Sequence, residues 1–183
     1  MKKVLILGDS ISMGYREHVR EALQGRAEVV YSEGNGCFSK WTLWLVNNWI
    51  RVNGAPDIVH WNNGIWDMMD EPPLQGNFSS PEEYLHNLSR IIQVLRTAGV
   101  RHIIFATTTY PHPKKEGLDA GTVTRYNAFA RTLMEQEGIA VNDLGALIRE
   151  NIAGYVCGDY LHLTHEGYLA CAAKVTEAIE AYL

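Results

Sequence analysis

Ser10 is the residue of this chain whose position most suggests chemistry. It follows the apolar run Val4-Leu5-Ile6-Leu7 and the turn Gly8-Asp9, at the point where a helical pattern begins. A turn of this kind lies at the carboxyl end of a strand, which is where open α/β sheets bind their ligands. Near the other end of the chain, Asp159 and His162 stand close together in sequence. A serine, a histidine able to take its proton and an acid able to orient the histidine are the parts of nucleophilic acyl transfer.

The glycine-bearing turn before Ser10 has a second interpretation, as a phosphate cradle at a helix N-terminus. The segment Gly8-Asp9-Ser10-Ile11-Ser12-Met13-Gly14 has neither Gly-x-Gly-x-x-Gly spacing nor a Gly-Lys-Ser/Thr ending, and Asp9 would repel an anion. A flavodoxin-like nucleotide binder is therefore disfavoured. A nucleophilic Ser10 needs a base within hydrogen-bond reach, and His162 can supply it.

Short apolar runs rich in β-branched residues predict strands, and the amphipathic stretches between them predict helices. The strand candidates are residues 4–7, 28–31, 58–61, 102–106 and 139–141. The clearest helix starts after Ser80, with Pro81 and a capping box to Glu83, and ends by Gly99; others are expected at 123–136 and 166–182. This βα order predicts an α/β fold, a three-layer α/β/α sandwich with a five-stranded parallel sheet, as a single domain over residues 1–183. Ser10 then lies at the carboxyl edge of the sheet, where segments 70–79 and 111–121 are candidates to shape a binding site.

Composition and charge argue against several classes of function. The hydrophobic share of 46% is ordinary for a globular chain, and the formal net charge of -5 comes without a long basic stretch, which argues against nucleic-acid binding. The first apolar run is too short for a signal peptide or a membrane span, so a cytoplasmic protein is expected. The cysteines lack Cys-x-x-Cys spacing, and no set of His, Asp and Glu has the spacing of metal ligands. No disulfide, metal or cofactor is predicted.

Three short motifs resemble those of the SGNH hydrolases, also called GDSL esterases and lipases. Gly8-Asp9-Ser10 is similar to the family's first block, Gly36 in Glu33-Gly34-Asn35-Gly36-Cys37 to its second, and Asp159-Tyr160-Leu161-His162 to its last. The resemblance implies the flavodoxin-like SGNH fold, with Ser10 as nucleophile, His162 as general base and then general acid, and Asp159 orienting the imidazole. It also implies that the backbone N–H groups of Ser10 and Gly36 face the oxyanion.

The third block of the family is where this chain departs from the pattern. The usual Gly-x-Asn-Asp falls on Gly64-Ile65-Trp66-Asp67, which puts Trp66 where the oxyanion-binding asparagine is expected. Asn62 and Asn63 precede this glycine at the end of the third strand, and an extended backbone would point them to opposite faces. We expect Asn63, which adjoins the glycine turn, to donate to the oxyanion. Asn62 is the alternative donor and a candidate substrate contact.

Tryptophans near the expected site bear on the substrate. Trp66 is expected at the active edge as an apolar or sugar-stacking wall, whereas Trp41, Trp44 and Trp49 on the helix after Gly36 are predicted to pack in the core. The resemblance and the lack of a long apolar lid favour a serine esterase acting on a short-chain acyl ester of a small molecule or carbohydrate. The alternatives are a lysophospholipase or thioesterase acting on longer acyl chains, and a non-catalytic binding module on the same fold.

Overall fold

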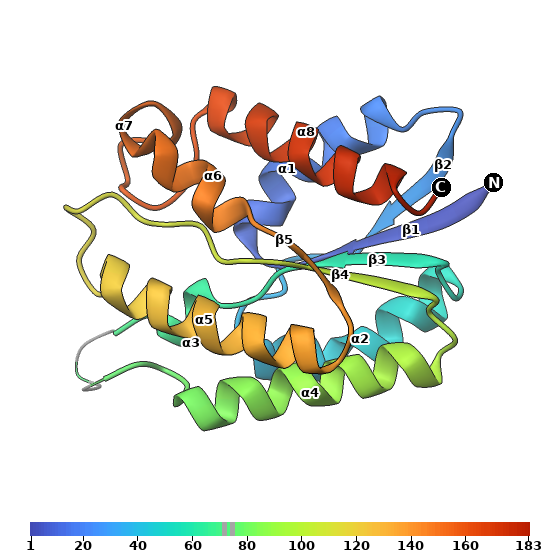
Figure 1. The fold of residues 1–183 in the computed structure, drawn as a ribbon, viewed down its shortest axis with the longest axis horizontal. Coiled ribbons are helices and arrows are strands. Elements are labelled where there is room, and N and C mark those ends of the chain that lie inside the picture. Colours follow the sequence, from blue (N-terminus) through green and yellow to red (C-terminus); the bar gives the residue numbers. More distant parts are fainter. Residues whose placement is uncertain (71–72, 74–75) are drawn as a thin grey trace.

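A computed structural model describes residues 1–70, 73 and 76–183. Its centre is a parallel sheet with the strand order β2-β1-β3-β4-β5 (Figure 1). The strands are β1 (Lys2–Leu7), β2 (Ala27–Tyr31), β3 (Ile58–Trp61), β4 (His102–Ala106) and β5 (Ala140–Asn142). Each lies within two residues of its predicted bounds, and the predicted five-stranded parallel sheet is confirmed.

Helices cover both faces of this sheet, as a three-layer sandwich requires (Figure 1). One face carries α1 (Ser10–Ala22), α6 (Leu144–Glu150), α7 (Ile152–Tyr155) and α8 (His165–Glu180). The other carries α2 (Ser39–Asn53), α3 (Ile65–Met68), α4 (Pro81–Thr97) and α5 (Ala120–Gln136). The chain passes from β1 to β2 on one side and then returns past β1 to β3 on the other. The carboxyl end of β1 therefore borders the point where the strand order reverses, the usual ligand site of such sheets.

Capping side chains explain where several of the helices begin. Ser80 Oγ accepts a hydrogen bond from the Glu83 N–H at 3.2 Å, and Glu83 Oε2 accepts one from the Ser80 N–H at 3.0 Å, which confirms the predicted capping box of α4. Asp9, Asp119 and Thr164 cap α1, α5 and α8 in the same way, through side-chain oxygens. Of these helices, α1 and α5 directly follow parallel strands, so their N-termini, with partial positive charge, lie at the carboxyl edge of the sheet.

The hydrophobic core is one cluster of buried side chains from both faces of the sheet. Val4, Leu5, Ile6 and Leu7 in β1 are buried without alternation, as expected for a central strand covered on both sides. His60 in β3 is also fully buried, and burial lowers its pKa to about 3, so this ring is neutral at physiological pH. A single core is what a one-domain chain requires, although the predicted domain bounds of 1–183 stay a prediction.

The tryptophans of α2 divide between core and surface. Trp49 is 3% exposed, as predicted, whereas the prediction is wrong for Trp41 and Trp44, which are 41% and 77% exposed. The buried positions of α2 include Thr42, Val46 and Trp49, which recur every three to four residues and define the helix face toward the core. Trp41 and Trp44 lie outside that face of the helix.

Within the described residues, the helices are all too short or too polar to cross a membrane.

Candidate active site

Ser10 is the first residue of α1 and directly follows the turn that ends β1. Gly8 has a φ of +152°, and a Cβ there would lie 1.9 Å from Asn62 Oδ1, so the turn requires glycine. Asp9 Oδ1 accepts a hydrogen bond from the Ile11 N–H at 3.0 Å and caps the helix. The N–H of a first helical residue has no partner within its own helix. The turn therefore presents both the hydroxyl and the backbone N–H of Ser10 at the carboxyl edge of the sheet.

Ser10, His162 and Asp159 form a continuous hydrogen-bonded chain. Ser10 Oγ lies 2.9 Å from His162 Nε2, although 152 positions separate the two residues in sequence. His162 Nδ1 lies 2.6 Å from Asp159 Oδ2. The structure thus brings together the three residues singled out in the sequence, at distances that permit proton transfer from the hydroxyl to the ring.

The loop after α7 fixes the positions of Asp159 and His162. Its two ends meet in a β-bridge between Val156 and Leu163. Within the loop, Asp159 Oδ1 accepts hydrogen bonds from the N–H groups of Leu161 and His162, each at 2.9 Å. Partial burial acts to raise the pKa of Asp159, but the hydrogen bonds from the His162 ring and these N–H groups outweigh it and hold the pKa well below its usual range. Asp159 is therefore ionised at neutral pH.

Asp9 places a buried carboxyl group next to Ser10. Its Oδ1 also accepts a hydrogen bond from Asn62 Nδ2 at 2.9 Å, whereas Oδ2 is buried and has no partner in the described part of the chain. Burial raises the pKa of Asp9 to about 6, and the hydrogen bonds from Asn62 and Ile11 offset only part of this effect. Asp9 is therefore a carboxyl group of raised pKa next to the predicted nucleophile, a property that its place in the first motif does not reveal.

Gly36 lies against the turn that carries Ser10. Its N–H donates to Gly8 O at 2.8 Å, and a Cβ on Gly36 would come within 2.6 Å of the same oxygen. Glycine is needed here because the two backbone segments approach so closely. The second motif is therefore adjacent to the first, as the predicted site requires, with the Gly36 N–H bonded to Gly8.

Asn62 and Asn63 contact opposite sides of the site. Asn62 donates to the turn before Ser10, as described above, whereas Asn63 Nδ2 donates to Cys37 O at 3.1 Å and to Thr42 Oγ1 at 3.0 Å. Asn63 Oδ1 accepts a hydrogen bond from Trp61 Nε1 at 2.6 Å. Both amide hydrogens of Asn63 thus have partners, and one bond would have to break for this side chain to reach an oxyanion. The role of Asn63 as an oxyanion donor stays a prediction.

Asp67, the last residue of the third motif, holds the neighbouring segments together through hydrogen bonds that the motif alone does not predict. Its Oδ1 accepts hydrogen bonds from Ser39 Oγ at 2.6 Å and Ser79 Oγ at 2.8 Å, and Oδ2 accepts one from the Ser39 N–H at 2.8 Å. This buried carboxyl group joins α3, the start of α2 and the segment before α4.

Trp66, the residue before Asp67, is 42% exposed. Its predicted place as a substrate contact stays a prediction.

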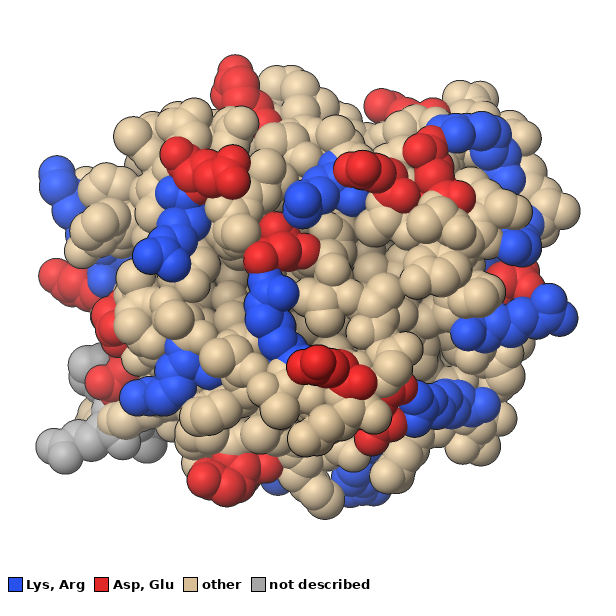
Figure 2. Space-filling view, viewed as in Figure 1, with Lys and Arg blue, Asp and Glu red and all other residues tan. Residues whose placement is uncertain are grey.

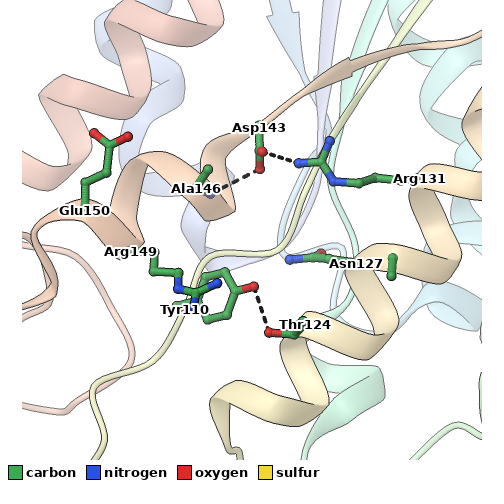
Figure 3. Close-up of a pocket in the computed structure, with 9 residues that line it drawn as sticks. Tyr110, Thr124, Asn127, Arg131, Asp143, Ala146, Arg149 and Glu150 are labelled. Atoms are coloured by element: carbon green, nitrogen blue, oxygen red, sulfur yellow. Dashed lines mark hydrogen bonds and ion pairs between the residues drawn. The ribbon is translucent and has the colours of Figure 1, made fainter.

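A pocket of about 520 Å³ lies between α5 and α6 (Figure 3). The predicted catalytic residues are not among those that line it. Arg131 pairs with Asp143 on one side, and on the other Tyr110 Oη lies 3.0 Å from Thr124 Oγ1 with the Arg149 guanidinium over its ring. Charged groups of both signs are mixed over this face of the molecule (Figure 2).

Among residues 1–70, 73 and 76–183, no cluster of three or more His, Cys, Asp or Glu side chains is placed to hold a metal.

The family model of the GDSL-like lipases and acylhydrolases matches residues 6–170. This stretch contains Ser10, Gly36, Asp159 and His162 and covers most of the chain. The protein belongs to the GDSL-like lipase/acylhydrolase family. The resemblance seen in the motifs is thereby confirmed, and so is the predicted enzyme class, a carboxylic ester hydrolase. A search of curated protein sequences finds no match.

Solved structures share the fold of this GDSL-like acylhydrolase. A lipase/acylhydrolase from Enterococcus faecalis matches with a TM-score of 0.86 at 18% identity, over 100% of this chain and 97% of that chain. The acetyl xylan esterase AlAXEase matches with a TM-score of 0.82 at 19% identity, over 97% of this chain and 99% of that chain. Axe2, an acetylxylan esterase from Geobacillus stearothermophilus, matches with a TM-score of 0.76 at 18% identity, over 97% and 94% of the two chains. The predicted SGNH hydrolase fold is confirmed.

Proposed function

We propose that this GDSL-like acylhydrolase is a serine esterase with a Ser-His-Asp triad. Ser10 is the nucleophile, His162 the general base and then the general acid, and Asp159 the group that orients the imidazole. The observation that carries the proposal is the chain of contacts from Ser10 Oγ through His162 to Asp159, at 2.9 Å and 2.6 Å. An ionised Asp159 fits this role because it stabilises the imidazolium that forms during the reaction.

The proposed hydrolysis passes through an acyl-enzyme. Ser10 Oγ attacks the ester carbonyl carbon and its proton passes to His162 Nε2, while the Nδ1–H remains bonded to Asp159. The tetrahedral intermediate then collapses, the bond to the alcohol breaks, and the alcohol leaves with the proton from Nε2. Water attacks the acyl-enzyme with His162 again as base, which releases the carboxylic acid and restores Ser10.

We assign the oxyanion to the backbone N–H groups of Ser10 and Gly36, with the Asn63 amide as the third donor. The position of Ser10 at the N-terminus of α1 supports the first assignment, because helix N-termini favour negative charge. Gly36 and Asn63 would each exchange a present hydrogen bond for one to the oxyanion. Such an exchange is favourable because hydrogen bonds to a charged acceptor are about twice as strong as neutral ones.

We further propose a short-chain acyl ester as the substrate, with an acetylated carbohydrate as the leading candidate. The exposed Trp66 ring after the end of β3, which can face a sugar, supports this choice. Two of the structures with the same fold are acetyl xylan esterases by name, which points in the same direction. The cytoplasmic location and the single domain over residues 1–183 remain part of the proposal.

The proposed function is tested with 4-nitrophenyl acetate, butyrate and octanoate on the wild-type protein and on Ser10→Ala. We expect the wild-type rate to fall with acyl length, and Ser10→Ala to lose about 10⁴-fold or more in kcat with its fold intact. A wild-type protein that is inert and also fails to react with a serine-directed fluorophosphonate would be the binding module instead. A preference for octanoate would favour the lysophospholipase or thioesterase alternative.

A further inference from the structure

A second pocket, of about 500 Å³, lies between the first turns of α2 and α4. Phe38 and Phe78 line it together with polar side chains that include Lys40, Glu83 and Asn87. The two phenyl rings lie 4.9 Å apart, and Phe78 is 51% exposed. This volume is within the range of pockets that hold small ligands. The proposed chemistry at Ser10 does not use any of these side chains.

Two residues that line this pocket, Asn87 and Ser79, belong to a buried hydrogen-bond network. Asn87 Nδ2 donates to Ser39 Oγ at 3.0 Å, and the hydroxyls of Ser39 and Ser79 both donate to Asp67 Oδ1. Phe38 and Phe78 each immediately precede one of these serines in sequence. Asp67 therefore fixes both aromatic residues by holding their neighbours, so the pocket is largely formed before a ligand arrives.

Backbone connections limit the distance between Ser10 and Phe38, which lines the pocket. Gly36, two residues before Phe38, donates to the backbone of Gly8, two residues before Ser10. At about 3.8 Å per residue, the path from Ser10 to Phe38 is no longer than roughly 20 Å. A short oligosaccharide spans such a distance.

The side chains that line the pocket indicate which class of ligand it would bind. The carboxylate of Glu83 lines the pocket together with the cations Lys40 and Arg90, so an anion attracted by the two cations is also repelled by Glu83. An acyl chain would bury these polar groups without partners, which costs free energy. A sugar ring suits both features, because its hydroxyls donate and accept hydrogen bonds while its C–H face packs on a phenyl ring.

We propose that the pocket between α2 and α4 is a glycan subsite that binds a neutral pyranose unit of an oligosaccharide whose acylated unit lies at Ser10. The role of this subsite in catalysis rests on the proposed function, because the subsite would place the ester of the substrate at Ser10. Binding to the pocket does not depend on catalysis.

Binding is tested first with unacylated β-1,4-linked tetrasaccharides of xylose, glucose, mannose and N-acetylglucosamine, by calorimetry and ligand-observed NMR. We expect at least one to bind the wild-type protein, and Phe78→Ala to weaken that binding about fivefold or more. Trp44→Ala is the matched control, since it removes an exposed aromatic side chain of α2 that does not line the pocket. It should leave binding unchanged.

Kinetics with an acetylated tetrasaccharide then connect the pocket to the reaction. Phe78→Ala should raise KM for the tetrasaccharide about fivefold and leave kcat/KM for 4-nitrophenyl acetate within about twofold of wild type. The absence of binding by all four sugars, or equal losses in Phe78→Ala and Trp44→Ala, would overturn the subsite. Failure to hydrolyse 4-nitrophenyl acetate would instead refute the proposed function, while the binding result still decides the subsite.

Discussion

Replacing Asp9 by Asn tests the origin of its raised pKa. Asn keeps the oxygen that caps α1 and accepts from Asn62, and Asn is as good a capping residue as Asp, but it removes the titrating group. The folded-state pKa of Asp9 is raised from 3.8 to about 6, with burial as the main cause. A raised acid pKa means that folding favours the protonated form, so the ionised form makes the folded protein less stable.

The size and pH range of the effect follow from the two pKa values. At about 1.4 kcal/mol for each pKa unit, ionisation of the buried carboxyl costs about 3 kcal/mol of stability. The contribution of Asp9 is fully present below pH 3.8 and is lost as the pH rises through about 6. Relative to Asp9→Asn, the wild-type protein should therefore lose about 3 kcal/mol between pH 3 and pH 7, with no further change at higher pH.

Urea unfolding of both proteins across this pH range measures the difference directly, because the other titrating groups are common to both. Asp119→Asn is the matched control, since Asp119 also caps a helix but is exposed. Hydrogen bonds from the Thr122 side chain and backbone lower the pKa of Asp119. Its stabilisation is therefore present above pH 3.8 and is lost only as the pH falls, the opposite direction to Asp9. Free energies of unfolding for wild type and Asp9→Asn that stay parallel from pH 3 to pH 7 would refute the reasoning.

Two further substitutions test the arrangement around Ser10. Asn63→Ala should lower kcat by about 10²-fold if Asn63 donates to the oxyanion, and intact turnover in Asn63→Ala together with lost turnover in Asn62→Ala would assign the role to Asn62. Gly36→Ala should destabilise the protein by about 1–3 kcal/mol and reduce turnover, because its Cβ would meet Gly8 O at 2.6 Å. Gly158→Ala, where a Cβ meets nothing within 4 Å, is the control, and urea unfolding with 4-nitrophenyl acetate turnover measures both effects.

The sheet could be predicted from the sequence because each strand is a short, continuous apolar run between turn residues. Residues 58–61 and 102–106 were predicted at the bounds that the structure has, since both strands are central and buried. The start of a helix was predicted less accurately where its N-capping residue was not recognised. α5 begins at Ala120 rather than Val123, because Asp119 Oδ1 accepts from the N–H groups of Gly121 and Thr122 and starts the helix earlier.

The side chains predicted to meet at the site could be found because their roles depend on residue type and order along the chain. Ser10 begins the helix that follows β1, and Asp159 and His162 share one loop, so both parts were expected at the carboxyl edge of the sheet. The partners of Asn63 could not be found in this way. The hydrogen bonds from its side-chain amide to Cys37 and Thr42 depend on how α2 packs beside β3, which neither the local sequence pattern nor the motif spacing specifies.

These amide contacts suggest how the site accommodates Trp66 at the third motif. Asn62 holds the turn before Ser10, and Asn63 holds the segment after Gly36, so each amide fixes a backbone segment whose N–H is a proposed oxyanion donor. The Ser10 N–H has no partner within its own helix and needs little reorganisation to meet an oxyanion, whereas the Gly36 N–H must first leave Gly8 O. Under this arrangement much of the charge stabilisation would come from main-chain N–H groups, and the position of the usual asparagine would be available for an exposed aromatic ring. The tryptophan could then contact substrate without loss of the oxyanion site.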